Sequence, residues 1–330
     1  MTMTVTETIR WGILGPGSIA RKFATGLQSV ADAKLVAVGS RSLDSANSFA
    51  DQFGAERRYG SYAELVADPE VDAIYVATPH SFHREHTELC LRAGKAVLCE
   101  KPFAINRTQS EAMIQVAREQ GVFLMEAMWT RFLPLIVRVR ELIAEGAIGE
   151  LRMLWSDFGF RTSVNPSSRL FDPALGGGGL LDVGIYPVSM AHLLLGKPNR
   201  IASMADLGST GIDEQAGMIL GFPGEKMAIL ATAVRTTTPM ETTIMGSEGS
   251  IRIHAPSWCP TQFTLTCKGK AELFEVPFEG NGYNYEAIEV GRCLRAGLLE
   301  SPGMTHADTL EIMGILDDIR TQWGMKYPME

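Results

Sequence analysis

The stretch Gly15-Pro16-Gly17-Ser18-Ile19-Ala20 decides the fold of the N-terminal part of the chain. A short apolar run, Arg10 to Leu14, precedes it as a predicted buried strand, and apolar residues at helical spacing follow it from Ser18 to Val30. Two glycines between a strand and a helix allow a sharp turn and a close approach of phosphate to the unpaired N–H groups of the helix. A small residue at the third position, Ala20, permits close packing of the helix on the strand. The stretch therefore predicts a phosphate-binding turn.

Strands and helices continue to alternate after this turn. Because a parallel strand needs a crossover helix to return the chain, the alternation predicts an α/β domain with a doubly wound parallel sheet of the Rossmann type. Its ligand would bind beyond the carboxyl ends of the strands. The further predicted strands are Lys34–Val38, Ala73–Ala77, Ala96–Cys99 and Val122–Met125, and the further predicted helices are Leu43–Phe53, a short helix capped by Ser61 and Glu64, Phe82–Ala93 and a helix begun by Asn106 with Gln109.

The end of the second strand indicates which dinucleotide binds. Enzymes that use NAD place an acidic residue there, which accepts hydrogen bonds from the ribose 2′-hydroxyl. This chain has Gly39-Ser40-Arg41-Ser42 instead, so no carboxylate would repel a 2′-phosphate, and Arg41 can bind it with a charge-assisted pair of hydrogen bonds. The sequence favours NADP over NAD, and an ordinary solvated arginine is the alternative.

Several polar residues follow other strand ends. Thr78 and His83 come just after the strand Ala73–Ala77, and we expect them beside the nicotinamide ribose. His80, His83 and His86 are three apart, but such steps drift around a helix and no convincing further ligand accompanies them. We therefore predict no metal site.

Lys101 is the first candidate for chemistry, because Glu100-Lys101-Pro102 follows the fourth predicted strand at the expected nicotinamide edge. Asp182 and Tyr186 are the others: they are four apart on a predicted helix after the glycines 176–179. A tyrosine has a reference pKa of about 10, and a nearby ammonium would lower it toward the range of a useful base. An exposed loop lysine and a buried Asp–Tyr hydrogen bond are the structural alternatives.

The pattern changes after Met125 to longer alternating runs with glycine turns, typical of a mostly antiparallel sheet. We predict two domains: residues 1–127 bind NADP, and residues 128–330 form an α+β domain with an open sheet and helices on one face. The strand near Met227–Val234 is apolar on both faces, so the second face is expected to meet another subunit. A C-terminal helix, Thr305–Gly324, is a candidate to pack back on the first domain.

The length, net charge and cysteine content of the chain argue against several classes of protein. A length of 330 residues suits two domains, and a net charge of -8 without basic runs argues against nucleic acid. The five cysteines are scattered, without a CxxC pair, so neither a disulfide framework nor zinc is indicated. Neither a signal peptide nor an 18-residue apolar stretch is evident, and we expect a cytoplasmic protein without a membrane span.

Taken together, these motifs resemble the Gfo/Idh/MocA oxidoreductases, and within them the NADP-dependent dihydrodiol and D-xylose dehydrogenase branch. The resemblance also covers the stretches at 126–132, 257–261 and 285–287. It implies a Rossmann domain, an open antiparallel sheet through which two subunits meet, and catalysis by Lys101 and Tyr186 beside Asp182. It further implies that the substrate pocket is lined by Trp129, Phe158, Asp182, Tyr186 and Trp258. The expected cofactor site comprises Gly15, Gly17, Ser18, Ile19, Ser40, Arg41, Thr78, His83, Glu100, Lys101 and Trp129.

The expected function is hydride transfer between NADP and a secondary hydroxyl or hemiacetal carbon, with Tyr186 as general acid and base assisted by Lys101. Pentoses such as D-xylose are the first expected substrates and trans-dihydrodiols the second. Another activity of the family, such as an anhydrosugar or keto-sugar reductase, shares every motif. A regulator that senses NADP without catalysis is the alternative from another class.

Overall fold

The computed structural model describes residues 8–330, which form two compact units. The first unit contains the chain up to Trp129 together with Glu279–Leu310. The second contains Thr130–Phe278 and Glu311–Glu330. Residues 128–330 were predicted to form one domain, but in the structure the segment Glu279–Leu310 belongs to the first unit.

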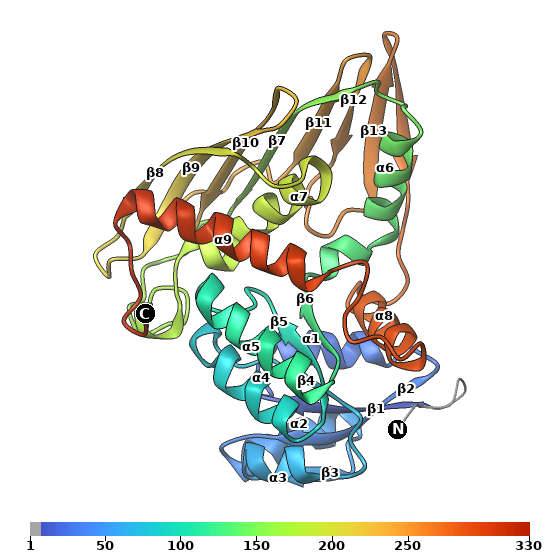
Figure 1. Ribbon diagram of the computed structural model, residues 1–330, viewed down its shortest axis with the longest axis vertical. Coiled ribbons are helices and arrows are strands. Elements are labelled where there is room, and N and C mark those ends of the chain that lie inside the picture. Colours follow the sequence, from blue (N-terminus) through green and yellow to red (C-terminus); the bar gives the residue numbers. More distant parts are fainter. Residues whose placement is uncertain (1–7) are drawn as a thin grey trace. The chain divides into compact units, whose positions relative to one another are not determined.

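The first unit is built on a six-stranded parallel sheet with the order β3-β2-β1-β4-β5-β6 (Figure 1). The predicted doubly wound sheet is thus confirmed, with the short edge strand β3 as an unpredicted addition. Its strands are β1 (Ile9–Leu14), β2 (Ala33–Gly39), β3 (Arg57–Tyr59), β4 (Ala73–Val76), β5 (Ala96–Glu100) and β6 (Leu124–Ala127). Its helices are α1 (Ser18–Leu27), α2 (Leu43–Phe53), α3 (Tyr62–Ala67), the turn η1 (His80–Phe82), α4 (His83–Arg92), α5 (Arg107–Gln120) and α8 (Asn284–Arg295).

Local sequence signals fix several helix starts in this unit. The Ser61 hydroxyl accepts the N–H of Glu64 at 3.2 Å, and the Asn106 side chain accepts the N–H of Gln109 at 2.8 Å, so both predicted caps are confirmed. Under these helices the core is aromatic. The ring of Phe23 stacks on Tyr75 at a centroid distance of 3.9 Å.

The helix α8 belongs to the first unit because it packs on α1. A Cβ atom at Gly26 would lie 2.6 Å from the side chain of Asn281, so only glycine permits this approach. The same Asn281 donates from its amide to the carbonyl of Lys22 at 2.8 Å. At the far end of α8, Arg295 forms an ion pair with Asp32 at 2.6 Å.

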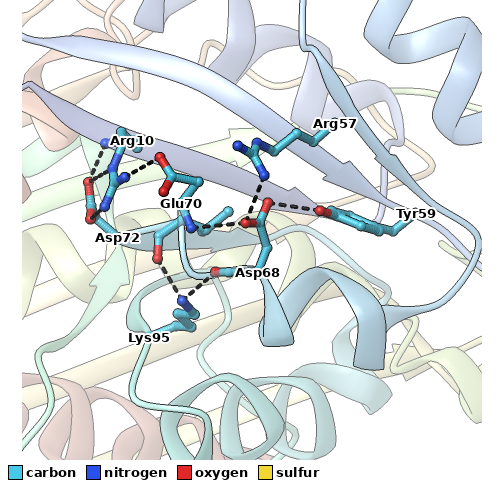
Figure 2. A network of polar contacts seen from close by, with 8 residues as sticks. Arg10, Arg57, Tyr59, Asp68, Glu70, Asp72 and Lys95 are labelled. Carbon is cyan, nitrogen blue, oxygen red and sulfur yellow. Dashed lines mark hydrogen bonds and ion pairs between the residues drawn. The ribbon is translucent and has the colours of Figure 1, made fainter.

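The amino ends of β1, β4 and β5 are joined by a network of charges, shown in Figure 2. Arg10 donates to both oxygens of Asp72, at 2.7 and 3.0 Å, and to Glu70 at 2.7 Å. Lys95 donates to the backbone carbonyls of Asp68 and Val71, at 2.6 and 2.8 Å. The nearly buried carboxylate of Asp68 also accepts from Tyr59, Arg57 and the backbone of Glu70. Every acid that is drawn in this network has a donor.

The second unit is built on an eight-stranded sheet with the order β14-β13-β12-β11-β7-β10-β9-β8. Its neighbours are antiparallel except for the parallel pair β10 and β7, which confirms the predicted, mostly antiparallel sheet. The strands are β7 (Leu151–Gly159), β8 (Arg200–Leu207), β9 (Asp213–Phe222), β10 (Lys226–Ala233), β11 (Thr242–Gly246), β12 (Gly249–Ile253), β13 (Gln262–Cys267) and β14 (Lys270–Glu275). The helices are α6 (Pro134–Ala144), the turn η3 (Pro173–Leu175), the π-helical turn η4 (Leu180–Gly184), α7 (Ile185–Leu195) and α9 (His306–Trp323); the turn η2 (Trp129–Phe132) and α9 each cross from one unit to the other along the chain.

The two faces of this sheet differ. The helix α7 contacts β7 and β10 on the inner face, where Ala228 and Leu230 are buried (Figure 1). On the other face Ile219, Ile229 and Trp155 are register partners across β9, β10 and β7, and all three are exposed. An exposed apolar row of this kind is typical of a surface that meets another protein.

One expectation about apolar segments was wrong. The segment Pro173–Leu195 has the length and composition of a membrane-spanning helix, although the sequence analysis found no such stretch. Gly and Pro residues interrupt it, and 78% of its most apolar window is buried within the structure, as in a core helix.

Candidate functional site

The glycine turn of the first unit has the geometry that a dinucleotide phosphate requires. Gly15 has a φ of +89°, and a Cβ there would lie 2.8 Å from Thr78. Gly17 precedes α1 with no side-chain cap, and an added Cβ would meet no atom within 4 Å. Ser18, which is exposed, and Ile19, which is half-buried, begin the first turn of α1. This end of α1 therefore offers unpaired N–H donors and open space, which fit a pyrophosphate.

The end of β2 carries an exposed arginine. Arg41 lies beside Tyr62 and His86, and it has no acidic partner among residues 8–330. Burial, assisted by the charge of Arg41, lowers the pKa of His86 to about 4, so this imidazole is neutral at physiological pH. The Ser40 hydroxyl is buried and accepts the N–H of Ser42 at 3.3 Å. A guanidinium that has no acidic partner in the described part of the chain fits a phosphate on the adenosine ribose.

Two of the histidines that follow β4, His83 and His86 of α4, both contact Thr78. The buried ring of His83 contacts the carbonyls of Thr78 and Pro102, both at 2.8 Å. His86 contacts the Thr78 hydroxyl at 3.0 Å. His83 thereby connects the loop after β4 to the loop after β5, and direct contact of Thr78 and His83 with a cofactor stays a prediction.

A buried acidic cluster lies at the carboxyl end of β5. Tyr75 donates to the carboxylate of Glu100, which also accepts the backbone N–H of Lys101 at 3.1 Å. Glu286 of α8 is fully buried, and neither of its carboxyl oxygens has a hydrogen-bond partner in the described part of the chain. Burial, and then the charge of Glu100, raises the pKa of Glu286 well above its ordinary value. Lys101 itself is half-buried at this edge.

Trp129 completes the predicted residues of the first unit. Its buried indole stacks on Tyr283, with the ring centroids 4.4 Å apart and the planes at 17°. Tyr283 comes directly before α8, and no signal in the sequence pattern identified it.

In the second unit the structure brings together three residues that the sequence predicted for the substrate pocket. Phe158 stacks on Trp258 at 3.9 Å and 11°, and Tyr186 lies 5.5 Å from Phe158 at 41°. They line one pocket, in which Thr130 donates to the carbonyl of Trp258 at 2.8 Å. The full lining is Thr130, Ser156, Asp157, Phe158, Tyr186, Pro187, Met190, Thr242, Ser257 and Trp258.

Asp182 and Tyr186 lie on successive helical segments. Asp182 belongs to the π-helical turn η4 and Tyr186 to the first turn of α7, whereas the spacing predicted one regular α-helix. Asp182 forms an ion pair with Arg169 at 2.9 Å. The glycines directly before η4 lie close to Asp213: a Cβ at Gly178 would overlap its Oδ1.

The pocket also contains polar residues that the sequence analysis missed. Ser156 and Thr242 share a hydrogen bond of 2.7 Å between β7 and β11, and Asp157 accepts the N–H of Met240 at 2.6 Å. These residues come from different strands and loops, so no local spacing could have identified them. Arg169, the partner of Asp182, lies in an irregular loop and was missed for the same reason.

Known proteins are similar to this chain over nearly its full length. Trans-1,2-dihydrobenzene-1,2-diol dehydrogenase from Mus musculus is 38% identical over 98% of this chain and 99% of its own, and the Homo sapiens protein of that name is 36% identical over the same shares. Among solved structures, a 3-ketoreductase from Actinomadura kijaniata in complex with NADP and TDP-benzene is 28% identical with a TM-score of 0.87, and covers 96% of this chain and 98% of its own. An aldose-aldose oxidoreductase from Caulobacter crescentus, complexed with glycerol, is 26% identical over the same shares with a TM-score of 0.89.

Both halves of the chain also match family models. The model of an oxidoreductase family with an NAD-binding Rossmann fold matches residues 9–128, and the model of the GFO/IDH/MocA C-terminal domain matches residues 136–252. The resemblance indicated by the sequence motifs is confirmed. The chain is an enzyme that belongs to the Gfo/Idh/MocA family of oxidoreductases.

Proposed function

We propose that this enzyme transfers a hydride between NADP and a secondary hydroxyl or hemiacetal carbon of a sugar or a cyclic diol. The observation that carries the proposal is the pocket of the second unit, where Tyr186 adjoins the stacked rings of Phe158 and Trp258. Flat aromatic walls fit the C–H face of a sugar or diol ring, and a few polar groups orient it. The relatives named for a dihydrodiol, and the neighbours named for aldoses and a 3-keto group, support this substrate class.

In the proposed mechanism a bound NADP would supply the hydride chemistry, and Gly15, Gly17 and the first turn of α1 would hold its pyrophosphate. Tyr186 removes the proton of the substrate hydroxyl during oxidation and returns it during reduction. A free tyrosine is a weak base at neutral pH because its reference pKa is about 10. Lys101 supplies the positive charge that stabilises the phenolate and lowers this pKa. Asp182, paired with Arg169, holds a substrate hydroxyl or orients Tyr186.

The central test combines a substrate screen with a conservative variant. NADP+ and NAD+ would be offered with pentoses, hexoses and cyclic diols, and NADPH with keto-sugars, while the absorbance of the reduced cofactor is followed. Tyr186→Phe should lower turnover roughly 100-fold or more while NADPH binding stays unchanged. Full turnover in this variant would refute the proton-transfer role. Bound NADP without turnover on any substrate would instead support the sensing regulator.

We propose NADP rather than NAD because Arg41 is exposed, has no acidic partner within residues 8–330, and lies in the stretch Gly39–Ser42, which contains no acidic residue. Arg41→Ala should weaken NADPH binding roughly 10- to 100-fold and leave NADH binding unchanged, because only NADPH carries the 2′-phosphate. Arg58→Ala is the matched control, since Arg58 is paired with Asp51 at 2.7 Å. Equal weakening of both cofactors would contradict the assignment.

We also propose a homodimer formed through the outer face of the second sheet, where Trp155, Ile219 and Ile229 form an exposed row. A charge in this row would lie in the interface, so Trp155→Asp should shift the protein to monomers in sedimentation equilibrium. Val137→Asp, on the exposed side of α6, should leave the association unchanged. A monomeric wild-type protein would rule out this interface.

A further inference from the structure

A buried carboxylate supports the glycine loop before the helix that carries Tyr186. Asp213, the first residue of β9, is fully buried, and its Oδ2 accepts the N–H of Leu180 at 2.6 Å. Leu180 is the first residue of the π-helical turn η4, which contains Asp182 and leads into α7. The carboxylate thus binds the backbone at the start of the segment that holds two candidate catalytic residues.

Two glycines of this loop leave the room that the carboxylate of Asp213 occupies. Gly178 has a φ of +119°, and a Cβ there would overlap Oδ1 of Asp213. A Cβ at Gly179 would lie 3.2 Å from Oδ2. The carbonyl of Gly179 accepts the hydroxyl of Thr232 at 3.3 Å, which fixes the loop from β10 as well. Side chains at these two positions would therefore displace either the loop or Asp213.

The C-terminal segment holds the same loop from another direction. The hydroxyl of Tyr327 donates to the carbonyl of Gly177 at 2.6 Å. The guanidinium of Arg320 lies 4.9 Å from the centre of the Tyr327 ring and forms an ion pair with Glu330 at 2.9 Å. Arg320 and Tyr327 are both nearly fully buried, so these contacts of the C-terminal segment belong to the packed interior of the second unit.

We propose that Asp213 is a positioning residue for the reaction, which orients η4 and the start of α7 through Leu180 and the glycine loop, with Tyr327 as its second support. The inference rests on the proposed function, because it assigns importance to the orientation of Tyr186. It goes beyond that function because it makes the orientation of Tyr186 depend on residues of β9 and the C-terminal segment, which do not line the pocket.

The charge of Asp213 makes this support sensitive to pH. Burial raises the pKa of Asp213 to about 7, against the opposing effects of the Leu180 N–H and the charge of Arg320. Arg320 and Tyr327 are the charged and titratable groups of the packed α9 and C-terminal segment that act on it. Burial, and then Asp213, raises the pKa of Tyr327 well above its ordinary value, so Tyr327 stays neutral. An ionised carboxylate accepts the Leu180 N–H more strongly than a neutral acid, so the support strengthens as pH rises through about 7.

Three variants separate this role from a general effect on folding. Asp213→Asn keeps the size and an acceptor oxygen but cannot ionise, Asp213→Ala removes the acceptor, and Tyr327→Phe removes only the bond to Gly177. We expect kcat to fall roughly 10-fold, 100-fold and a few-fold in these variants, with NADPH affinity unchanged, since small misplacements of a reacting group are costly. Glu272→Gln, an exposed acid on β14, is the control and should behave as wild type.

The pH profile and hydrogen exchange decide the proposal. The wild-type kcat should contain an inflection near pH 7 that Asp213→Asn lacks, and amide exchange in a peptide covering residues 176–186 should rise in Asp213→Asn and Asp213→Ala. An unchanged pH profile together with unchanged exchange would overturn the positioning role, whatever the activity. A different outcome separates the two proposals. If amide exchange rises in the Asp213 variants but Tyr186→Phe is fully active, Asp213 still supports the loop and the proposed function of Tyr186 is refuted.

Discussion

The two ends of the parallel sheet in the first unit differ in whether their acidic residues have hydrogen-bond donors. At the amino end, Asp72 is held by two donors of Arg10, and the network of Figure 2 supplies a donor to each acid that it contains. At the carboxyl end, Glu286 is fully buried beside the charge of Glu100 and lacks a hydrogen-bond partner among the described residues. An acid that has hydrogen-bond donors can be buried without a large loss of stability. A buried acid without donors lowers the stability of the folded state, and such acids are found mainly at functional sites.

The largest expected effect comes from replacing the lysine at the carboxyl end of the sheet with methionine, compared with the same replacement at the amino end. Lys101→Met should lower kcat roughly 100-fold or more, a barrier increase of about 2.7 kcal/mol, because the proposed phenolate loses its counter-charge. Lys95→Met is the matched variant at the amino end, where the ammonium donates to the carbonyls of Asp68 and Val71. It should lower the melting temperature and leave kcat near the wild-type value. Steady-state kinetics and thermal unfolding of both variants check the contrast, and a normal kcat in Lys101→Met would break it.

A smaller effect is expected for the main ion pair of the amino end. Arg10→Met leaves Asp72, whose side chain is 10% exposed, without its guanidinium partner. The free energy of unfolding should fall by about 2 kcal/mol, less than for a fully buried pair because Arg10 is partly exposed. Urea denaturation measures this change. Lys34→Met, which breaks the exposed pair with Glu56, should change stability by about 0.5 kcal/mol or less, and equal losses in the two variants would show that burial does not matter here.

Apart from the control Lys34→Met, the smallest effect at neutral pH is expected for Glu286→Gln. The pKa of Glu286 is raised in the folded state, so its favourable contribution is complete below the unfolded value of about 4.3 and is lost as pH rises through the folded value. The amide cannot ionise, so the variant should gain stability relative to wild type as pH rises from 5 to 8. At pH 7 the net gain should be about 1 kcal/mol, because the amide donors also need partners. Parallel stability curves of the two proteins over this pH range would contradict a raised pKa.

Much of the first unit could be predicted from its sequence, because its signals are local. The Gly15 turn, the caps at Ser61 and Asn106 and five apolar strand runs each act within a few residues. The strand β3 was missed because Arg57-Arg58-Tyr59 is short, charged and at the sheet edge, without an apolar pattern. The strand β12 is hard to recognise in the sequence because it opens with Gly249 and Ser250, residue types more typical of a turn.

The candidate site was less predictable because its contacts are not local. The stack of Phe158 on Trp258 joins positions far apart in sequence, and those residues were identified by family resemblance rather than by spacing. The role of an acidic residue also depends on its burial, which its residue type does not reveal. In the sequence Asp213 is an ordinary acid at the start of a strand, and only the structure shows that it packs against the glycine loop. The glycines themselves were the available signal, since four in a row imply that something packs closely against the backbone.

The return of the chain to the first unit has a consequence for biosynthesis. On the ribosome, strands β1 to β6 are complete long before α8 is made, because the whole sheet of the second unit is translated in between. Until α8 arrives, the surface of α1 at Gly26 and the indole of Trp129 lack the partners that cover them in the finished enzyme. The nascent N-terminal part therefore stays incomplete until the whole second sheet and α8 have been translated.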